Sequence, residues 1–160
     1  MVRDLELTVN GETRRVRVDD NATLLDVLRN HLDLKAARFG CGAGQCGTCA
    51  VIIDGKDVAS CQLEVGNLEG KPITTLEGIG AIDRPHPLQT AFLELQAGQC
   101  GYCLAGILVA AKALLDRNPS PTRAEIAEAL AWHLCRCGAH NRILAAVALA
   151  AERMRQEVTA

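Results

Sequence analysis

Two close pairs of cysteines in the second half of the sequence have the spacing of a metal site. Cys100 and Cys103 are separated by two residues, and Cys135 and Cys137 by one. Four thiols arranged in two such pairs are typical ligands of either a zinc ion or an iron–sulfur cluster. The spacing alone therefore predicts a metal centre and leaves the identity of the metal open.

A second, independent set of cysteines lies upstream, at Cys41, Cys46, Cys49 and Cys61. The first three have the C-x4-C-x2-C spacing of plant-type two-iron ferredoxins. Glycines at four positions between residues 40 and 47 allow the loop the backbone conformations that wrapping around a small cluster requires. A structural zinc site is the alternative, but zinc usually prefers paired C-x2-C knuckles, and only Cys46 and Cys49 have that spacing. We interpret this set as the ligands of a [2Fe-2S] cluster.

The surroundings of the downstream set favour a cluster there as well. Each of its cysteine pairs comes just before a predicted helix, and a helix N-terminus presents free N–H groups and a positive dipole end to an anionic group. His133 and His140 flank the second pair, but a Rieske centre needs two histidine ligands and four cysteines already fill the site. We therefore interpret both histidines as structural or surface residues.

Composition excludes several other classes of function. The 160 residues are 49% hydrophobic with a formal net charge of −2, which argues against a basic nucleic-acid-binding surface. The first residues have no charged and apolar leader, and no apolar run is long enough for direct membrane insertion. We expect a protein that is cytoplasmic at assembly, with any membrane association or export occurring through its partner. In such a reducing compartment, eight cysteines in two groups of four favour metal binding over disulfides.

The elements that position the upstream set form a small mixed domain. Alternating apolar residues predict a strand over 3–9, and Asn10-Gly11 predicts a hairpin turn into a second strand through Val16 and Val18. Thr23 with Asp26 is a capping-box pattern for a helix. Its predicted buried stripe is Leu24, Leu25, Leu28 and Leu32, and further strands are predicted near 50–53, 58–59 and 73–75.

The elements that position the downstream set are all helical. Two glycines and two prolines between residues 78 and 87 predict a linker. Helices are predicted after Pro87, over 104–115, after the capping box of Thr122 and Glu125, and after Asn141. Ile126, Ala129, Leu130 and Leu134 form the predicted apolar stripe of the third helix. The fold class is therefore α+β, with a ferredoxin-like domain over 1–79 and a four-helix-bundle domain over 80–160.

These motifs together resemble the small iron–sulfur subunit of the molybdenum hydroxylases, the xanthine oxidase family. The resemblance runs nearly end to end, through 40–49, Cys61, 74–78, 99–103 and 135–138. It implies a β-grasp ferredoxin domain and a helical bundle, each with one [2Fe-2S] cluster. It also implies that the cluster of the bundle is nearer to the molybdenum cofactor of a large molybdenum-binding partner subunit.

The resemblance also assigns a role to two residues that face the partner. By match of position, Gln99 and the thiolate of Cys137 would contact the pterin of the partner's molybdopterin cofactor, in its cytosine dinucleotide form. Two departures from the common family pattern occur, at Leu104-Ala105-Gly106 and at His140. The segment that ends in His140 looks closer to the nicotinate and isoquinoline dehydrogenase subgroup. That subgroup passes electrons to a cytochrome c subunit or domain in place of a flavin subunit.

The function that follows is an electron relay. The partner's molybdopterin centre would oxidise an N-heteroaromatic or aldehyde-like substrate, and this chain would carry the electrons through two [2Fe-2S] clusters to an external acceptor. The substrate site would lie in the partner, with no catalytic residue in this chain. The alternatives are a free-standing two-cluster ferredoxin and a zinc-stabilised interaction module.

Overall fold

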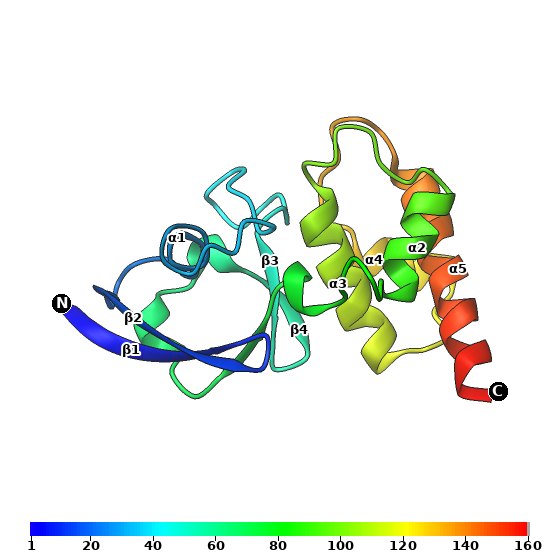
Figure 1. Ribbon diagram of the computed structural model, residues 1–160. Helices are drawn as coiled ribbons and strands as arrows, with labels where there is room; N and C mark the ends of the chain where they lie inside the picture. Colours follow the sequence, from blue (N-terminus) through cyan, green and yellow to red (C-terminus); the bar gives the residue numbers. More distant parts are fainter. Residues whose placement is uncertain (160) are drawn as a thin grey trace.

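The computed structural model describes residues 1–159 and joins a five-stranded sheet to a helical half (Figure 1). The strand order is β2-β1-β5-β3-β4; β1 pairs with β5 in parallel, and the other neighbours are antiparallel. The mixed sheet and the helices make an α+β fold, as the sequence predicts. The strands are β1 (Val2–Val9), β2 (Glu12–Asp19), β3 (Ala50–Ile53), β4 (Lys56–Ala59) and β5 (Pro72–Thr74).

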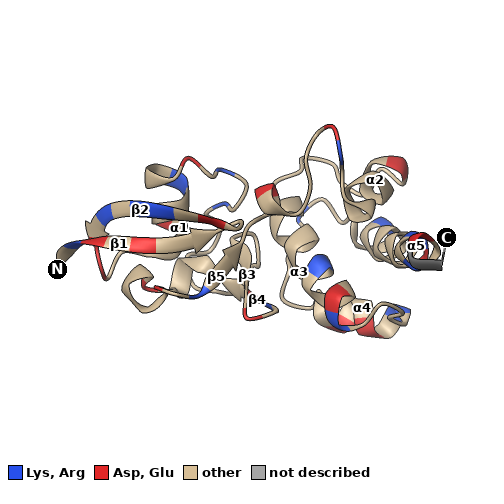
Figure 2. Ribbon diagram, turned by 60° about the horizontal axis from the view of Figure 1, so that its bottom comes forward, with Lys and Arg blue, Asp and Glu red and all other residues tan. Residues whose placement is uncertain are grey.

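The first hairpin follows the predicted pattern. β1 and β2 pair with Val9 opposite Glu12, across the turn at Asn10 and Gly11. The alternating residues Leu5 and Leu7 are fully buried in the core of the sheet half. The other face is polar, and Figure 2 shows basic and acidic residues side by side along β1 and β2. The alternation therefore identifies both the strand and its buried face.

The helix predicted after Thr23 is present but is not a regular α-helix. Its first turn is α1 (Leu24–Asp26), and it continues as the π-helix η1 (Val27–His31). The hydroxyl of Thr23 accepts the backbone N–H of Asp26, which is one half of the predicted capping box. The predicted buried stripe is confirmed, since all four of its leucines lie in the core. The periodicity of the leucines thus predicts the buried face of this helix but not its π-helical geometry.

Three short 3₁₀ segments complete the sheet half: η2 (Ser60–Gln62), η3 (Val65–Asn67) and η4 (Leu76–Gly78). The α-helices α2 (Pro87–Glu94), α3 (Leu104–Arg117), α4 (Arg123–Ala129) and α5 (His140–Thr159) follow. They surround their own core of leucine, alanine and isoleucine side chains. The capping box of Thr122 and Glu125 is confirmed in both directions.

Two predictions about the helices need correction. The sequence predicts Leu134 in the apolar stripe of the third helix, but α4 ends at Ala129 and the Leu134 side chain is 60% exposed. The last helix begins at His140, one residue before the predicted cap at Asn141. In the segment between α4 and α5, the backbone of Leu134 lies against the sheet half, where its N–H donates to the carbonyl oxygen of Cys46. The Leu134 side chain therefore does not join the core of the helical half.

The two halves meet where α3 packs against β3 and β4. At this junction Gly106 of α3 approaches the backbone of Gly47 so closely that a Cβ atom would overlap the Gly47 carbonyl oxygen. The contact therefore requires glycine at position 106. Among the helices of the helical half, Figure 1 shows α3 nearest to the sheet and α5 on the far side. Among the described residues, no helix combines the length and apolarity that a membrane crossing requires.

Candidate metal centres

The upstream cysteines lie in the loop before β3 and in the 3₁₀ turn after β4. Cys41 and Cys46 lie in the loop before β3, Cys49 directly precedes that strand, and Cys61 lies in η2 beyond the hairpin of β3 and β4. Cys49 and Cys61 are buried, whereas Cys41 is exposed and Cys46 is half-buried. The hairpin thus returns Cys61 to the loop, as the sequence predicts.

Within this set the thiols associate in twos. Cys41 contacts Cys46, and Cys49 contacts Cys61. In the downstream set, the sulfurs of Cys100 and Cys137 are 3.5 Å apart, and Cys103 contacts Cys135. No group of three or more ligand-type side chains suited to a single ion occurs among the described residues. Thiols in two pairs are the arrangement that a two-iron cluster needs, because each iron takes two cysteine ligands.

Backbone N–H groups point at the upstream sulfurs. The N–H groups of Ala43 and Gln45 lie 3.3 and 3.2 Å from the sulfur of Cys41, and the N–H of Cys41 lies 3.4 Å from that of Cys46. The donors to Cys41 lower its pKa to about 7, with Ala43 making the largest contribution. A sulfur held in this way is prepared to carry negative charge, which is what a metal ligand does.

Burial has the opposite effect on the inner cysteines. It raises the pKa of Cys49 to about 11 and that of Cys103 to about 12. Thiols that are this costly to ionise in a protein interior become thiolates when a metal compensates the charge. The exposed Cys100 again has a lowered pKa, because the backbone N–H of Tyr102 and the thiol of Cys137 donate to it.

The glycines of the upstream loop fit a tightly wrapped group. A Cβ atom at Gly40 would lie 2.7 Å from the sulfur of Cys46. Gly47 has φ of +72°, and the His133 ring fills the space where its side chain would be. The loop could not keep this shape with larger residues at these two positions. The donor set, its pairing and its N–H groups therefore fit a [2Fe-2S] cluster.

The helix termini lie where the sequence places them for the downstream set. α3 begins at Leu104 directly after Cys103, and α5 begins three residues after Cys137. The N–H of Ala139, just before α5, acts on the Cys135 thiol: burial opposes ionisation of Cys135, but this donor and the Cys103 thiol leave its pKa lowered. The first turns of both helices thus adjoin the cysteines.

The two sets share a cavity of about 190 Å³ between the halves of the molecule. Its lining includes Cys41 and Cys46 from one set and Cys100, Cys103 and Cys135 from the other. Across the junction the N–H of Leu134, the residue before Cys135, donates to the carbonyl of Cys46 over 3.0 Å. The sequence predicts two sites but does not predict this direct backbone link between them.

Gln99 lies at the exposed edge of the downstream set. Its side-chain amide donates to the carbonyl oxygen of Cys137 over 3.3 Å. Gln99 is exposed and Cys137 is half-buried, so a partner molecule can reach both. The structure thus brings together the two residues that the resemblance assigns to a pterin contact.

His133 has a role that the sequence leaves open between structural and surface. It is buried, and its Nε2 lies 3.2 Å from Oδ2 of Asp57 in β4, which also accepts the indole N–H of Trp132 over 3.1 Å. Within the described residues, Nδ1 of His133 is a buried atom without a hydrogen-bond partner. Asp57, a polar residue next to a turn, gave no sequence signal for this contact between the two halves.

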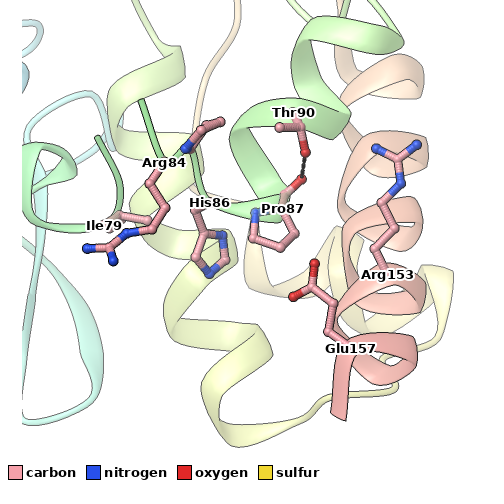
Figure 3. Close-up of a pocket in the computed structure, with 8 residues that line it drawn as sticks. Ile79, Arg84, His86, Pro87, Thr90, Arg153 and Glu157 are labelled. Carbon is pink, nitrogen blue, oxygen red and sulfur yellow. Dashed lines mark hydrogen bonds between the residues drawn. The ribbon is translucent and has the colours of Figure 1, made fainter. Parts of the chain in front are cut away.

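A separate hollow of about 440 Å³ lies behind the linker and contains none of the cysteines (Figure 3). Its residues come from the linker, α2 and α5. Figure 3 shows His86 and Pro87 at the start of α2, with the guanidinium groups of Arg84 and Arg153 on opposite sides of them. His86 caps α2 by accepting the N–H of Leu88 at Nδ1 over 3.1 Å. This hollow belongs to the packing of the linker rather than to the cysteine sites.

Comparison with known proteins connects both halves to iron–sulfur families. Residues 7–74 match the 2Fe-2S iron-sulfur cluster binding domain, and residues 75–148 match the [2Fe-2S] binding domain. The small FeS subunit of nicotinate dehydrogenase from Eubacterium barkeri is 44% identical over 93% of this chain and 95% of its own length. A nicotinate dehydrogenase chain of Pseudomonas putida is 47% identical over 98% of this chain and 99% of its own length.

Solved structures show the same fold. Quinoline 2-oxidoreductase from Pseudomonas putida 86 contains a chain with a TM-score of 0.91 and 35% identity, and the match covers 97% of both chains. The aldehyde oxidoreductase from Desulfovibrio desulfuricans matches with a TM-score of 0.92 and 45% identity, over 96% of this chain but 17% of that longer chain. The relatives thus include a chain named as a small FeS subunit and a much longer oxidoreductase chain of which this chain matches one part. The chain belongs to the family of small [2Fe-2S] iron–sulfur subunits of the molybdenum hydroxylases.

Proposed function

We propose that this chain is the electron-transfer component of a molybdenum-dependent hydroxylase or dehydrogenase, placed between an external acceptor and a large molybdenum-binding subunit. A bound [2Fe-2S] cluster supplies one-electron carrier chemistry at each cysteine set. The observation that carries the proposal is the contact between the two cysteine sets, which we call the seam: both sets line one cavity, and the N–H of Leu134 donates to the carbonyl of Cys46. Two redox sites held this close by backbone contacts are suited to pass electrons from one to the other.

The cysteines have distinct tasks in this proposal. The upstream ligands are Cys41, Cys46, Cys49 and Cys61, and the downstream ligands are Cys100, Cys103, Cys135 and Cys137. The N–H groups at Cys41 stabilise its thiolate, and the buried thiols keep water from the inner side of each site. Such contacts to sulfur set the reduction potential of a cluster.

Gln99 and Cys137 form the proposed entry point for electrons. The Gln99 amide is already held at the carbonyl of Cys137, and Gln99 itself is exposed. An amide both donates and accepts, so it can pair with the edge of a pterin ring. We propose that these residues contact the partner's molybdopterin cofactor, in its cytosine dinucleotide form.

The finer assignments extend the same proposal. The relatives named for nicotinate, isoquinoline and aldehyde oxidation support an N-heteroaromatic or aldehyde-like substrate in the partner. A cytochrome c subunit or domain is the proposed acceptor, ahead of a flavin subunit, and any membrane association or export would come through the partner. We assign residues 1–79 to a β-grasp ferredoxin-like domain and 80–160 to a four-helix-bundle domain, which the two separate cores support.

Copurification of the tagged chain from its native host tests the partner. We expect a larger, molybdenum-containing chain in about equal amount, with two rhombic EPR signals after dithionite reduction. A colourless chain that contains zinc would contradict the proposal, and a two-cluster chain that copurifies with no molybdenum protein would identify a free-standing ferredoxin instead.

Variants of the complex test the entry point. We expect Gln99→Ala and Cys137→Ser to slow reduction of the clusters by substrate about tenfold or more, while the EPR signal of the upstream cluster stays intact. Gln96→Asn is the matched control, because Gln96 is another exposed glutamine near the start of the same segment, with a φ of +50° that asparagine tolerates. Unchanged reduction by substrate in both Gln99 and Cys137 variants would place the entry point elsewhere.

A further inference from the structure

The seam between the two cysteine loops is crossed by Tyr102, which lies between Cys100 and Cys103. The Tyr102 hydroxyl donates to the carbonyl of Phe39 over 2.5 Å, and the Tyr102 carbonyl accepts the hydroxyl of Thr48 over 3.1 Å. Phe39 and Thr48 bracket the part of the upstream loop that contains Cys41 and Cys46. One residue of the downstream loop is thus tied to both ends of the upstream loop.

Arg38 adds a positive charge to this seam. Its guanidinium donates to the carbonyl of Gly101 over 2.9 Å and to that of Tyr102 over 3.3 Å. Its central carbon lies 5.2 Å from the centre of the Tyr102 ring, within range of a cation–π contact. The backbone N–H of Arg38 donates to the carbonyl of Thr48 over 3.3 Å, and the residue is half-buried. Its position is therefore fixed at both its backbone and its side chain.

A fixed cation at this place acts on both sites. The two carbonyls that it contacts belong to residues between Cys100 and Cys103, and its own backbone lies three residues before Cys41. A thiolate-ligated cluster is anionic, and reduction adds one more negative charge. A nearby positive charge stabilises the reduced form more than the oxidised form, so it raises the reduction potential.

No acidic side chain neutralises Arg38 among the ion pairs of the described residues. Most other arginines of the sheet half differ in this respect: Arg3, Arg14, Arg15 and Arg17 each pair with a carboxylate on the polar face of the sheet. Arg38 instead uses its donors on carbonyl oxygens of the downstream loop. Its full charge is thus retained next to the two cysteine sets.

We propose that Arg38 is a positioning residue shared by the two [2Fe-2S] sites: it holds the two cysteine loops together and raises the reduction potential of the downstream cluster. This proposal rests on the cysteine ligands of the proposed function. It adds that the driving force for electron entry into this chain depends on a residue of the sheet half. The two sites are therefore coupled through one side chain as well as through the backbone.

The test is an EPR-monitored redox titration of the purified chain, or of its complex, with both clusters loaded. We expect Arg38→Gln to lower the equilibrium constant for one-electron reduction of the downstream cluster about tenfold, which corresponds to 59 mV. Arg38→Lys should recover most of this loss because it keeps the charge. Arg38→Met keeps the stem over the Tyr102 ring without the charge, and replaces the Gln variant if that variant loses its clusters.

Two further variants separate the effect of the Arg38 charge from that of the Tyr102–Phe39 hydrogen bond, which also joins the two loops. Arg29→Gln is the matched control, since the Arg29 guanidinium also donates to two carbonyls, those of Lys35 and Ala37, outside the cysteine loops. It should leave the potential of the downstream cluster unchanged. Tyr102→Phe removes the bond to Phe39 and keeps Arg38, so it should lower thermal stability with little change in potential.

Potentials that stay at the wild-type value in Arg38→Gln or Arg38→Met, with two intact EPR signals, would overturn the proposal. An equal decrease in Arg29→Gln would also overturn it, because any lost arginine would then have the same effect. Neither result touches the proposed function, which would instead fail through the absence of a molybdenum partner.

Discussion

The backbone N–H of Leu134 donates to the carbonyl oxygen of Cys46 over 3.0 Å, and this bond joins the two cysteine sets directly. Leu134 precedes Cys135 in the chain, so the connection runs through one peptide unit on each side of a hydrogen bond. Gly106 of α3 lies against the carbonyl of the next residue, Gly47. The spacing of the two proposed redox sites is therefore set by backbone contacts, which side-chain motion does not relax.

Gly106→Ala should separate the two halves. The added Cβ atom would overlap the carbonyl of Gly47 and crowd the backbone of Thr48, and neither is the flexible end of a side chain. We expect a loss of stability of about 2–3 kcal/mol, measured by chemical denaturation. The upstream cluster should also be lost first on dilution, since Gly47 lies between two of its proposed ligands.

Ala145→Ser is a suitable control for Gly106→Ala, because it adds one atom on the exposed side of α5. Its stability and iron content should match the wild type. A Gly106→Ala chain with wild-type stability would show that α3 shifts freely on the sheet, contrary to the close contact at Gly47.

Asp57→Ala should weaken the same junction from its other side. The Asp57 carboxylate, only 12% exposed, accepts the indole N–H of Trp132 and lies within hydrogen-bond distance of the Nε2 of His133. Its removal leaves buried polar groups without a partner, which costs about 1–3 kcal/mol. Trp132 is the one tryptophan in the sequence, so quenching of its fluorescence by acrylamide should increase in the variant.

Asp57→Asn keeps one acceptor oxygen and should retain part of the stability, whereas Lys56→Ala, at an exposed neighbour, should have no effect. Equal quenching in Asp57→Ala and in the wild type would show that Trp132 keeps its environment without the carboxylate. The stability of the junction would then not depend on the Asp57 carboxylate.

Much of this architecture follows from local sequence signals. The alternation of Leu5 and Leu7, the Asn10-Gly11 turn and the capping box of Thr122 are short-range features, and each appears where predicted. Such features need only the residue itself and a few neighbours in the chain. The same reason explains why the pairing of β1 with β5 was not predicted, since it joins residues over sixty positions apart.

The candidate metal centres also combine short-range features that the sequence predicts with long-range contacts that it does not. Cysteine spacing predicts two sets, because three ligands of the first and each pair of the second lie close in sequence. The contacts between the sets are long-range: Asp57 with His133, and Arg38 with Gly101. The exposure of Leu134 also depends on such a contact, because an apolar residue in helical register normally predicts burial. Only the folded backbone shows that its N–H is used at Cys46.

Removal of the clusters should reveal different reactivity among the thiols. The pKa of Cys41 is about 7, lowered by the N–H groups of Ala43 and Gln45, and that of Cys49 is about 11. At pH 7 about half of Cys41 is thiolate, against a fraction on the order of 10⁻⁴ for Cys49. We expect iodoacetamide to label Cys41 first, with a half-maximal rate near pH 7, measured by peptide mapping of the cluster-free chain.

Cys103, with a pKa of about 12, provides an internal comparison and should stay unlabelled longest. Equal rates at Cys41 and Cys103 across pH 6–9 would mean that the loops lose their shape without the cluster. Retention of the difference would show that the chain forms the N–H arrangement around Cys41 before any metal arrives.

Stability of the helical half should decrease as the pH falls below about 6.5. His86 caps α2 by accepting the N–H of Leu88 at Nδ1, while the Gln89 side chain accepts the N–H of His86. Burial and the charge of Lys112 lower the pKa of His86 from its usual value of 6.5. Below pH 6.5 His86 therefore binds a proton more readily in the unfolded chain than in the folded chain. The free energy of unfolding decreases as the pH falls from 6.5 to the lowered pKa of the folded state.

His86→Asn isolates this effect from the general acid sensitivity of the clusters. Asparagine is a good helix N-cap that does not titrate, so it keeps the acceptor for Leu88 at every pH. We expect the melting temperatures of the wild type and the variant to differ little above pH 7, and the wild type to melt increasingly below the variant between pH 6.5 and 5. Parallel pH profiles for the two chains would show that protonation of His86 does not break the cap.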